Sequence, residues 1–240
     1  MRILITNDDG MQASQLVPLV KWCQRLGQVV TYVPKYEQSG KSHGIELHTH
    51  FEAKQVELEP GITVWAVDST PADCVRFAVL GMHEKIDLVI SGINRGLNIG
   101  TDTVYSGTIG AACEAVALGI PAIAISTPPK FYESAITHLD RVYQFFMDHH
   151  LMEHNNIYNV NIPVDPKEIL ITRQGGRYYS DDFVPMDNDQ YLPKGKCVYE
   201  SSDDLTLDTD AAMNGYISIS PLTINKTNMD VFQELRKINP

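Results

Sequence analysis

The stretch ILITNDDG, from Ile3 to Gly10, decides how the chain begins to fold. Its first half is apolar and largely β-branched, which is typical of a buried strand in a parallel sheet. The chain then places Asp8 and Asp9 side by side before a glycine. Two unit charges about 5 Å apart repel each other by about 3 kcal/mol at an effective dielectric constant near 20. We therefore expect the two carboxylates either to share a proton or to bind a cation.

The size and charge of the chain limit its class. A chain of 240 residues that is 43% hydrophobic fits one large α/β domain, or a domain with a smaller lobe. Nineteen Lys and Arg against thirty Asp and Glu give a net charge of −11, and no basic run occurs. This composition argues against binding to duplex DNA or RNA. A small anion can still bind where a cation or a helix N-terminus outweighs the global charge.

The sequence also bears on location. The segment MRILITNDDG resembles neither a signal peptide nor a membrane anchor, and no apolar run reaches about eighteen residues. The cysteines lack the CxxC spacing of a zinc site, which favours reduced thiols and a cytoplasmic protein without a membrane partner. They are Cys23, Cys74, Cys113 and Cys197.

Strand and helix patterns alternate over roughly the first 130 residues. This alternation predicts an α/β, Rossmann-like fold, a doubly wound and mostly parallel sheet whose ligands bind in loops at the carboxyl ends of strands. Thr70 as N-cap, Pro71 at the first helical position and Asp73 form a well-defined helix start. The expected strands are Ile3–Thr6, Gln28–Val33, Asp87–Ser91 and Pro121–Ser126; the other expected helices are Gln15–Leu26 and Thr108–Leu118.

Two regions depart from this alternation. HGIELHTH alternates strictly and, together with VELEP and ITVWAV, predicts antiparallel hairpins inserted at about residues 44–67. From Ile169 the chain has short strands (ILITR, GYISISPL), a polar connection near Tyr179–Asp189 and an amphipathic helix, Asn228–Ile238. We expect a catalytic core over residues 1–168. Residues 169–240 are expected to form a C-terminal hairpin and helix extension. This extension is not needed to complete the sheet, and we expect it to pack on a neighbouring part of the protein or on another subunit.

Three loops carry the candidate chemistry. The first contains Asp8 and Asp9; the second, after the second strand, contains Ser39; the third, SGINRGLNIGTDTVYSGTIG, delivers Asn94 and Asn98. Carboxylate, amide and hydroxyl oxygens suit Mg²⁺, Mn²⁺ or Ca²⁺ rather than zinc. The third loop ends in Ser106, Gly107 and Thr108, where exposed N–H groups and hydroxyls at a helix N-terminus can bind phosphate, or serve only as a cap.

The second loop also matches two better-known patterns in part. Its GKS sequence lacks the upstream glycine of a P-loop, because that position is Lys35. GKSHG matches the nucleophile elbow of serine hydrolases, but that motif needs a strand before it and a helix after it, and here an alternating segment follows. An esterase with Ser42 as nucleophile is therefore a weak alternative.

The motifs together resemble the survival protein SurE family. The similarity is collinear from Arg2 to Leu222 and is carried by ILITNDDG, EQSG, STPADCV, SGINRGLNIG, YSGTIGAACEA, NVNIP and TDAAMNGYISISPL. The resemblance implies a phosphatase of nucleoside 5′- and 3′-monophosphates that depends on one divalent metal ion per subunit, Mg²⁺ or Mn²⁺, and in some members acts on short polyphosphate. It also implies C-terminal segments exchanged between subunits of a homodimer or homotetramer.

Carried over by position, the family's metal ligands fall on Asp8, Asp9, Ser39 and Asn94. The phosphate-side residues fall on Asn98, Ser106, Gly107 and Thr108. The chain departs from the family pattern with MQASQL after NDDG, and with Ser69 where a glycine is usual, so the rim of the pocket is expected to differ.

The expected mechanism is metal-assisted attack of water on phosphorus. Asp8, Asp9 and Asn94 are its predicted catalytic residues, with Asp9 the better candidate for the general base. The amides and hydroxyls on the phosphate side would stabilise charge on the phosphoryl oxygens. The alternative from another class is a nucleotide-binding regulatory protein that has the same site but no turnover.

Overall fold

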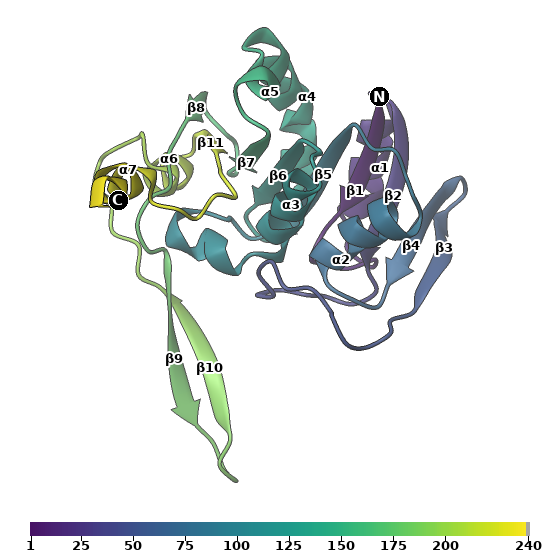
Figure 1. Ribbon diagram of the computed structural model, residues 1–240, viewed down its shortest axis with the longest axis horizontal. Helices are drawn as coiled ribbons and strands as arrows, with labels where there is room; N and C mark the ends of the chain where they lie inside the picture. Colours follow the sequence, from purple (N-terminus) through teal and green to yellow (C-terminus); the bar gives the residue numbers. More distant parts are fainter. Residues whose placement is uncertain (239–240) are drawn as a thin grey trace.

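The computed structural model describes residues 1–238 and shows a central sheet covered by helices on both faces (Figure 1). Its nine strands are ordered β3-β4-β2-β1-β5-β6-β7-β11-β8. They span Arg2–Thr6 (β1), Gln28–Pro34 (β2), Ala53–Glu59 (β3), Ile62–Val67 (β4), Leu88–Arg95 (β5), Ala122–Thr127 (β6), Ile157–Asn161 (β7), Ile169–Ile171 (β8) and Ile217–Pro221 (β11). The pairings from β4 through β2, β1, β5 and β6 to β7 are all parallel, which confirms the doubly wound architecture.

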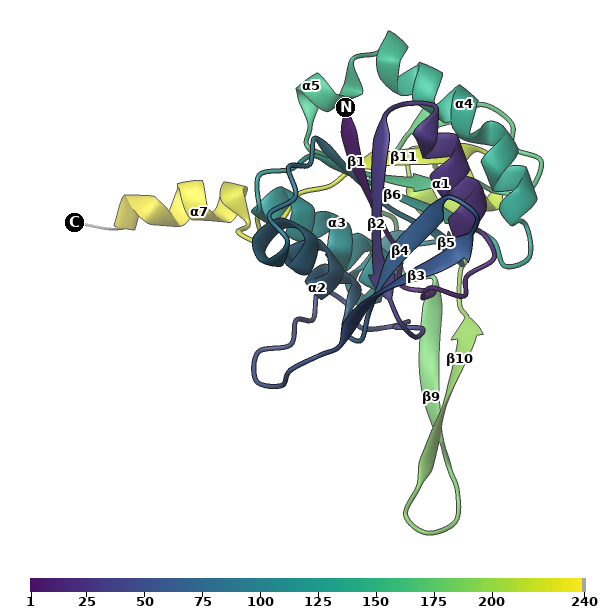
Figure 2. The same ribbon diagram turned by 90° about the vertical axis from the view of Figure 1, so that its right-hand side faces the viewer.

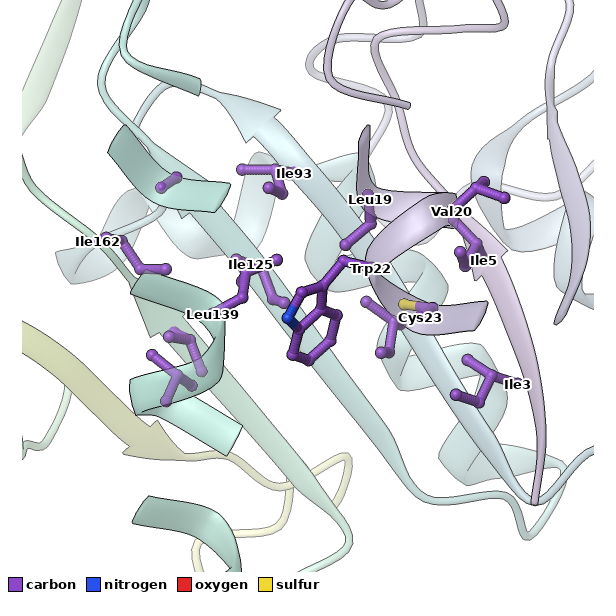
Figure 3. Packing of buried hydrophobic residues seen from close by; sticks show 14 of the residues in the cluster. Ile3, Ile5, Leu19, Val20, Trp22, Cys23, Ile93, Ile125, Leu139 and Ile162 are labelled. Carbon is purple, nitrogen blue, oxygen red and sulfur yellow. The ribbon is translucent and has the colours of Figure 1, made fainter. Parts of the chain in front are cut away.

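The helices form two layers. Buried side chains of α1 (Leu16–Gln24) and α4 (Tyr132–Asp148) belong to one apolar core, and those of α2 (Pro71–Arg76) and α3 (Gly107–Ala117) belong to the other. Figure 3 shows Trp22 of α1 beside Leu139 of α4, with Ile3 and Ile5 of β1 and Ile125 of β6 in the same core. The alternation of apolar strands and amphipathic helices in the sequence therefore led to the correct layers.

The predicted start of α2 is confirmed in detail. The Thr70 side chain accepts a hydrogen bond from the Asp73 backbone N–H at 3.1 Å, and Pro71 is the first helical residue. Asn228 caps α7 (Met229–Leu235) in the same way, through the N–H of Val231.

The prediction for residues 44–67 is only partly right. β3 and β4 form the expected antiparallel hairpin, but β4 also pairs in parallel with β2, so the hairpin extends the main sheet instead of standing apart from it. HGIELHTH, in contrast, is an exposed loop without a strand. Its alternation has no neighbouring strand to pair with, and the Glu46 carboxylate instead accepts the backbone N–H groups of His48 and Thr49.

The prediction that the tail is not needed to complete the sheet is wrong for two strands. β7 is fully buried, and its outer edge is paired antiparallel with β11, which in turn pairs with β8. Buried backbone N–H and C=O groups must find partners, so a buried edge recruits whichever segment of the chain can reach it.

The remaining tail is more ordered and more extended than the sequence indicates. Most of the stretch read as a polar connection is β9 (Tyr179–Pro185), which pairs with β10 (Tyr191–Cys197) in an antiparallel hairpin. Figure 2 shows this hairpin and α7 projecting from the body in different directions. The other short α-helices are α5 (Leu151–His154) and α6 (Asp208–Met213), and a π-helix (Phe77–Gly81) and two 3-10 helices (Gly100–Tyr105 and Arg236–Ile238) are also present.

Candidate functional site

The candidate site lies where the direction of winding changes. From β1 the chain builds the sheet outward through β2 and β4, and from β5 it builds the other way through β6 and β7, so β1 and β5 are neighbours at the switch point. Loops that leave adjacent strands in opposite directions open a crevice at the carboxyl edge. Asp8 and Asp9 follow β1, and Asn94 lies near the end of β5.

A tight turn fixes the acidic pair. The Asn7 side chain accepts the N–H of Gly10 at 3.0 Å and donates to the Gly10 carbonyl at 3.1 Å. The N–H of Gln38 donates to the Asp8 carbonyl at 2.7 Å, which joins this turn to the loop that carries Ser39. Gly10 has φ +85° and lies against the Tyr36 backbone, a position that suits only glycine.

Asp8 is directed at the first turn of α3. Its Oδ1 accepts the Thr108 hydroxyl at 2.8 Å and its Oδ2 accepts the Thr108 N–H at 3.1 Å. Gly107 allows this approach, since a Cβ there would lie 3.0 Å from the Asp8 Cβ. Burial raises the pKa of Asp8, while the two bonds from Thr108 act to lower it. The positive end of the helix macrodipole favours the ionised form.

Asp9 is directed toward β5. Its Oδ2 accepts Gln15 Nε2 at 2.6 Å and the Arg95 N–H at 3.0 Å, and the Arg95 Nε lies 3.7 Å from Oδ1. Burial first, and the neighbouring charge of Asp8 second, raise the pKa of Asp9 to about 6. The Arg95 guanidinium is shared between Asp9 and Glu37, and within residues 1–238 no ion pair to Asp8 is found. Excess negative charge of this kind is the electrostatic condition that a divalent cation relieves.

The amide and hydroxyl candidates flank this pair. Asn94 donates through Nδ2 to the Gly96 carbonyl at 2.8 Å, and the residues described form no hydrogen bond to its Oδ1. Ser39 is exposed on the neighbouring loop, where its hydroxyl donates to Glu37 at 2.8 Å. Glu37 also accepts Arg95 Nη2 at 2.8 Å, so the Ser39 loop and the end of β5 are linked across the crevice.

The donor set fits a hard cation. Within residues 1–238, no cluster of three or more His, Cys, Asp or Glu side chains could hold a metal ion. A site at this edge would therefore depend on only two carboxylates, completed by amide and hydroxyl oxygens. An all-oxygen set of this kind suits Mg²⁺ or Mn²⁺, which retain several waters when bound, and it lacks the sulfur and imidazole ligands of zinc sites.

Three of the four predicted phosphate-side residues lie at the start of α3. Ser106 is its N-cap and accepts the N–H of Ile109 at 3.1 Å. Thr108 uses both its donors on Asp8, so in this structure it positions a carboxylate. No hydrogen-bond partner for the Gly107 N–H occurs within residues 1–238. Of the backbone donors at this helix start, Gly107 N–H is thus available to a phosphate oxygen.

Asn98, the fourth, is tied into the sheet. Its backbone N–H donates to Asn161 Oδ1, its carbonyl accepts the amides of Asn159 and Asn161, and its Nδ2 donates to Ser126 at 2.8 Å. This network fixes the third loop over the ends of β6 and β7. A phosphate contact by Asn98 stays a prediction.

Several site residues were not found from the sequence. Gln15, Glu37 and Arg95 reach the acidic pair or its flanking loop with long side chains from separate elements, and no spacing rule connects them. Asn7 could have been recognised, since Asn two or three residues before Gly is the pattern of an Asx turn.

The nucleophile-elbow alternative finds no support in the geometry. Ser42 lies in a loop and donates its hydroxyl to the Val104 carbonyl at 2.7 Å, while the adjacent His43 contacts Glu114 at 2.6 Å. The hydroxyl is therefore engaged by a backbone acceptor, and within residues 1–238 no histidine contacts it as a base.

The fold and the site define an α/β protein with acidic and other oxygen-bearing side chains at the switch point of its sheet. Residues 3–181 match the family model described as survival protein SurE. The chain belongs to the SurE family.

Similarity to individual proteins extends over the whole chain. It is 37% identical over 254 residues to the 5′-nucleotidase SurE of Thermoanaerobacter sp. (strain X514), covering 98% of this chain and 97% of that protein. It is also 37% identical over 248 residues to the 5′-nucleotidase SurE of Syntrophotalea carbinolica, covering 99% and 97%. The crystal structure of SurE from Aquifex aeolicus superposes with a TM-score of 0.80 at 29% identity and covers 100% of both chains.

Proposed function

We propose that the protein is a 5′-nucleotidase, a phosphomonoesterase that converts nucleoside monophosphates to nucleosides and phosphate. The observation that carries the proposal is the meeting of Asp8, Asp9 and Asn94 at the β1–β5 switch point, beside the start of α3. Similarity over the full chain to proteins named 5′-nucleotidase SurE supports the same reaction. Activity on 3′-monophosphates and on short polyphosphate belongs to the proposal as well.

The proposed cofactor is one divalent ion per subunit, Mg²⁺ or Mn²⁺, held by Asp8, Asp9, Ser39 and Asn94. Such an ion would supply Lewis-acid polarisation of the phosphoryl group and a bound water of lowered pKa. Thr108 fixes Asp8 in place, and Gln15 together with the Arg95 N–H does the same for Asp9.

The remaining groups of the chain orient the phosphate and move the proton. The Gly107 N–H lies at the positive end of α3 and would bind a phosphoryl oxygen as charge develops on it, with Ser106 and Asn98 as the further predicted contacts. Asp9 Oδ1 makes no hydrogen bond within residues 1–238, so it is the carboxylate oxygen free to accept the proton of the attacking water.

We further propose a cytoplasmic homo-oligomer. Within residues 1–238, no helix is both long and apolar enough to cross a membrane. The projecting hairpin β9–β10 exposes Phe183, Tyr191 and Leu192, and α7 buries none of its side chains. An apolar hairpin and an amphipathic helix extended away from the body are suited to pack on another subunit.

A phosphate-release assay tests this function. Purified protein is given AMP, GMP and 3′-AMP with Mg²⁺, Mn²⁺, Co²⁺ or Ca²⁺, then with EDTA, and finally with added metal. We expect release with Mg²⁺ or Mn²⁺, loss in EDTA and recovery on metal addition. Nucleotide binding without turnover under every condition would instead support the regulatory alternative, and activity indifferent to chelation would reject the metal.

A further inference from the structure

A cleft of about 750 Å³ opens beside Ser39, one of the predicted metal ligands, and is larger than a phosphate group alone requires. At one end it is lined by Ser39 and Gly40, and at the other by Arg177, Tyr178 and Tyr179 at the base of the β9–β10 hairpin. The volume is within the usual range for a small-molecule site. A phosphate next to Ser39 would leave most of this cleft to the rest of the substrate.

The first wall of the cleft is joined to the site loop. The N–H of Ser42 donates to the Tyr105 carbonyl at 3.0 Å, and the Ser42 hydroxyl donates to the Val104 carbonyl at 2.7 Å. The loop that carries Ser39 is thereby attached to the segment that leads into Ser106. Tyr105 is thus held between the predicted metal ligand and the predicted phosphate contacts.

The base of the hairpin is attached to the segment that carries Tyr105. The Tyr179 N–H donates to Asp102 Oδ2 at 2.6 Å, and the Thr101 N–H donates to the Gly176 carbonyl at 3.1 Å. The buried Asp208 carboxylate accepts both the Gly100 N–H and the Gly175 N–H. The base of the hairpin is therefore a fixed part of the site rather than a free strand end.

The chemistry of this wall suits a planar, polar ring. Tyr105 and Tyr179 line the cleft with 64% and 47% of their surfaces exposed, so both rings are accessible to a ligand there. Tyr178 packs behind Tyr179, with ring centroids 5.2 Å apart. Asp102 and Arg177 add a hydrogen-bond acceptor and donors at the edges of the cleft.

We propose that Tyr105 and Tyr179 form the nucleobase-binding wall of the site, so that these two rings determine the preference for nucleotides over simple phosphate esters. This inference rests on the proposed function and extends it to substrate recognition. Base–aromatic stacking accepts every base, because each has a π face, so the wall would favour nucleotides as a class over base-free monoesters.

Paired substrates test the proposal. Tyr105→Ala and Tyr179→Ala are compared with wild type on AMP and on ribose 5-phosphate, which has the same sugar and phosphate but no base. We expect kcat/KM for AMP to fall about tenfold in each variant, within the range for loss of one base stack, with ribose 5-phosphate unchanged. Tyr179→Phe, which keeps the ring, should retain activity on AMP, and Tyr191→Ala on the hairpin should change neither substrate.

Binding of adenosine in EDTA, measured by calorimetry, separates this inference from the proposed function. Loss of adenosine binding in both alanine variants supports the wall even if the protein hydrolyses no nucleotide. The inference is overturned if kcat/KM in the alanine variants falls equally for AMP and ribose 5-phosphate, or does not fall for AMP. It is also overturned if Tyr191→Ala has the same effect, or if the wild-type protein binds no adenosine.

Discussion

Replacing Thr108 with valine tests whether this residue positions Asp8 or contacts phosphate. Valine keeps the shape of the side chain and removes one atom group, the hydroxyl that donates to Asp8 Oδ1 at 2.8 Å. Thr108 is fully buried, so water cannot replace the lost donor. A hydrogen bond to a charged group contributes about 1.5–3 kcal/mol, and for a chain of this size that corresponds to a melting temperature lower by about 3–12 °C.

The assay combines melting in EDTA with a titration of Mn²⁺ by initial rates. If Thr108 positions Asp8, Thr108→Val should melt earlier and need more Mn²⁺ for half-maximal activity, while KM for AMP at saturating metal stays near the wild-type value. Thr108→Ser is the matched control, because it keeps the hydroxyl and loses only a methyl group. Unchanged melting and metal requirement, with a raised KM for AMP, would refute the positioning role and favour the phosphate contact.

Three further changes test the site and its supports. Asp8→Asn should lower phosphate release at least about a hundredfold, since metal assistance supplies several kcal/mol, while circular dichroism shows an intact fold; full activity would remove Asp8 from the site. Glu114→Gln should lower the free energy of unfolding by about 1–2 kcal/mol at neutral pH. Hydrogen bonds from His43 and Arg76 lower the pKa of the Glu114 carboxyl below its usual 4.5, so its stabilising effect is complete above that pH and is lost as pH falls through the lowered value. If the difference in unfolding free energy between Glu114→Gln and the wild type stays the same as the pH is lowered below 4.5, the proposed role of the Glu114 carboxylate is contradicted. Asp208→Ala should cost at least about 2 kcal/mol by leaving two backbone N–H groups without their acceptor, and it should raise KM for AMP more than it lowers kcat; an unchanged KM would argue against coupling of the hairpin base to the cleft.

Much of the core could be predicted because its signals are local. The run Ile3–Thr6 is apolar over a strand length, and the Thr70–Asp73 cap satisfies helix N–H groups within a few residues. The placement of Asp8, Asp9 and Asn94 at one edge also followed from the alternation, since parallel strands bring their carboxyl ends together.

Contacts between distant segments could not be predicted. The pairing of β11 with β7 depends on which backbone edge remains buried and unpaired, and no property of GYISISPL specifies that edge. HGIELHTH shows the opposite case, a segment that alternates like a strand but forms an exposed loop. Alternation leads to a strand only where a partner strand is present. Thr108 was recognised as a helix-start residue, but its Asp8 partner lies 100 positions away.

The sequence by itself determined the alternation of strands and helices over roughly the first 130 residues, the carboxylate pair and the family resemblance, because these depend on neighbouring residues and on motif identity. Only the tertiary structure decided that Thr108 donates to Asp8, that β8 and β11 complete the sheet, and that the base of a hairpin forms a wall of the cleft. The physical reason is that these features satisfy buried polar groups and edges with partners far along the chain, and such partners exist only after the core has packed.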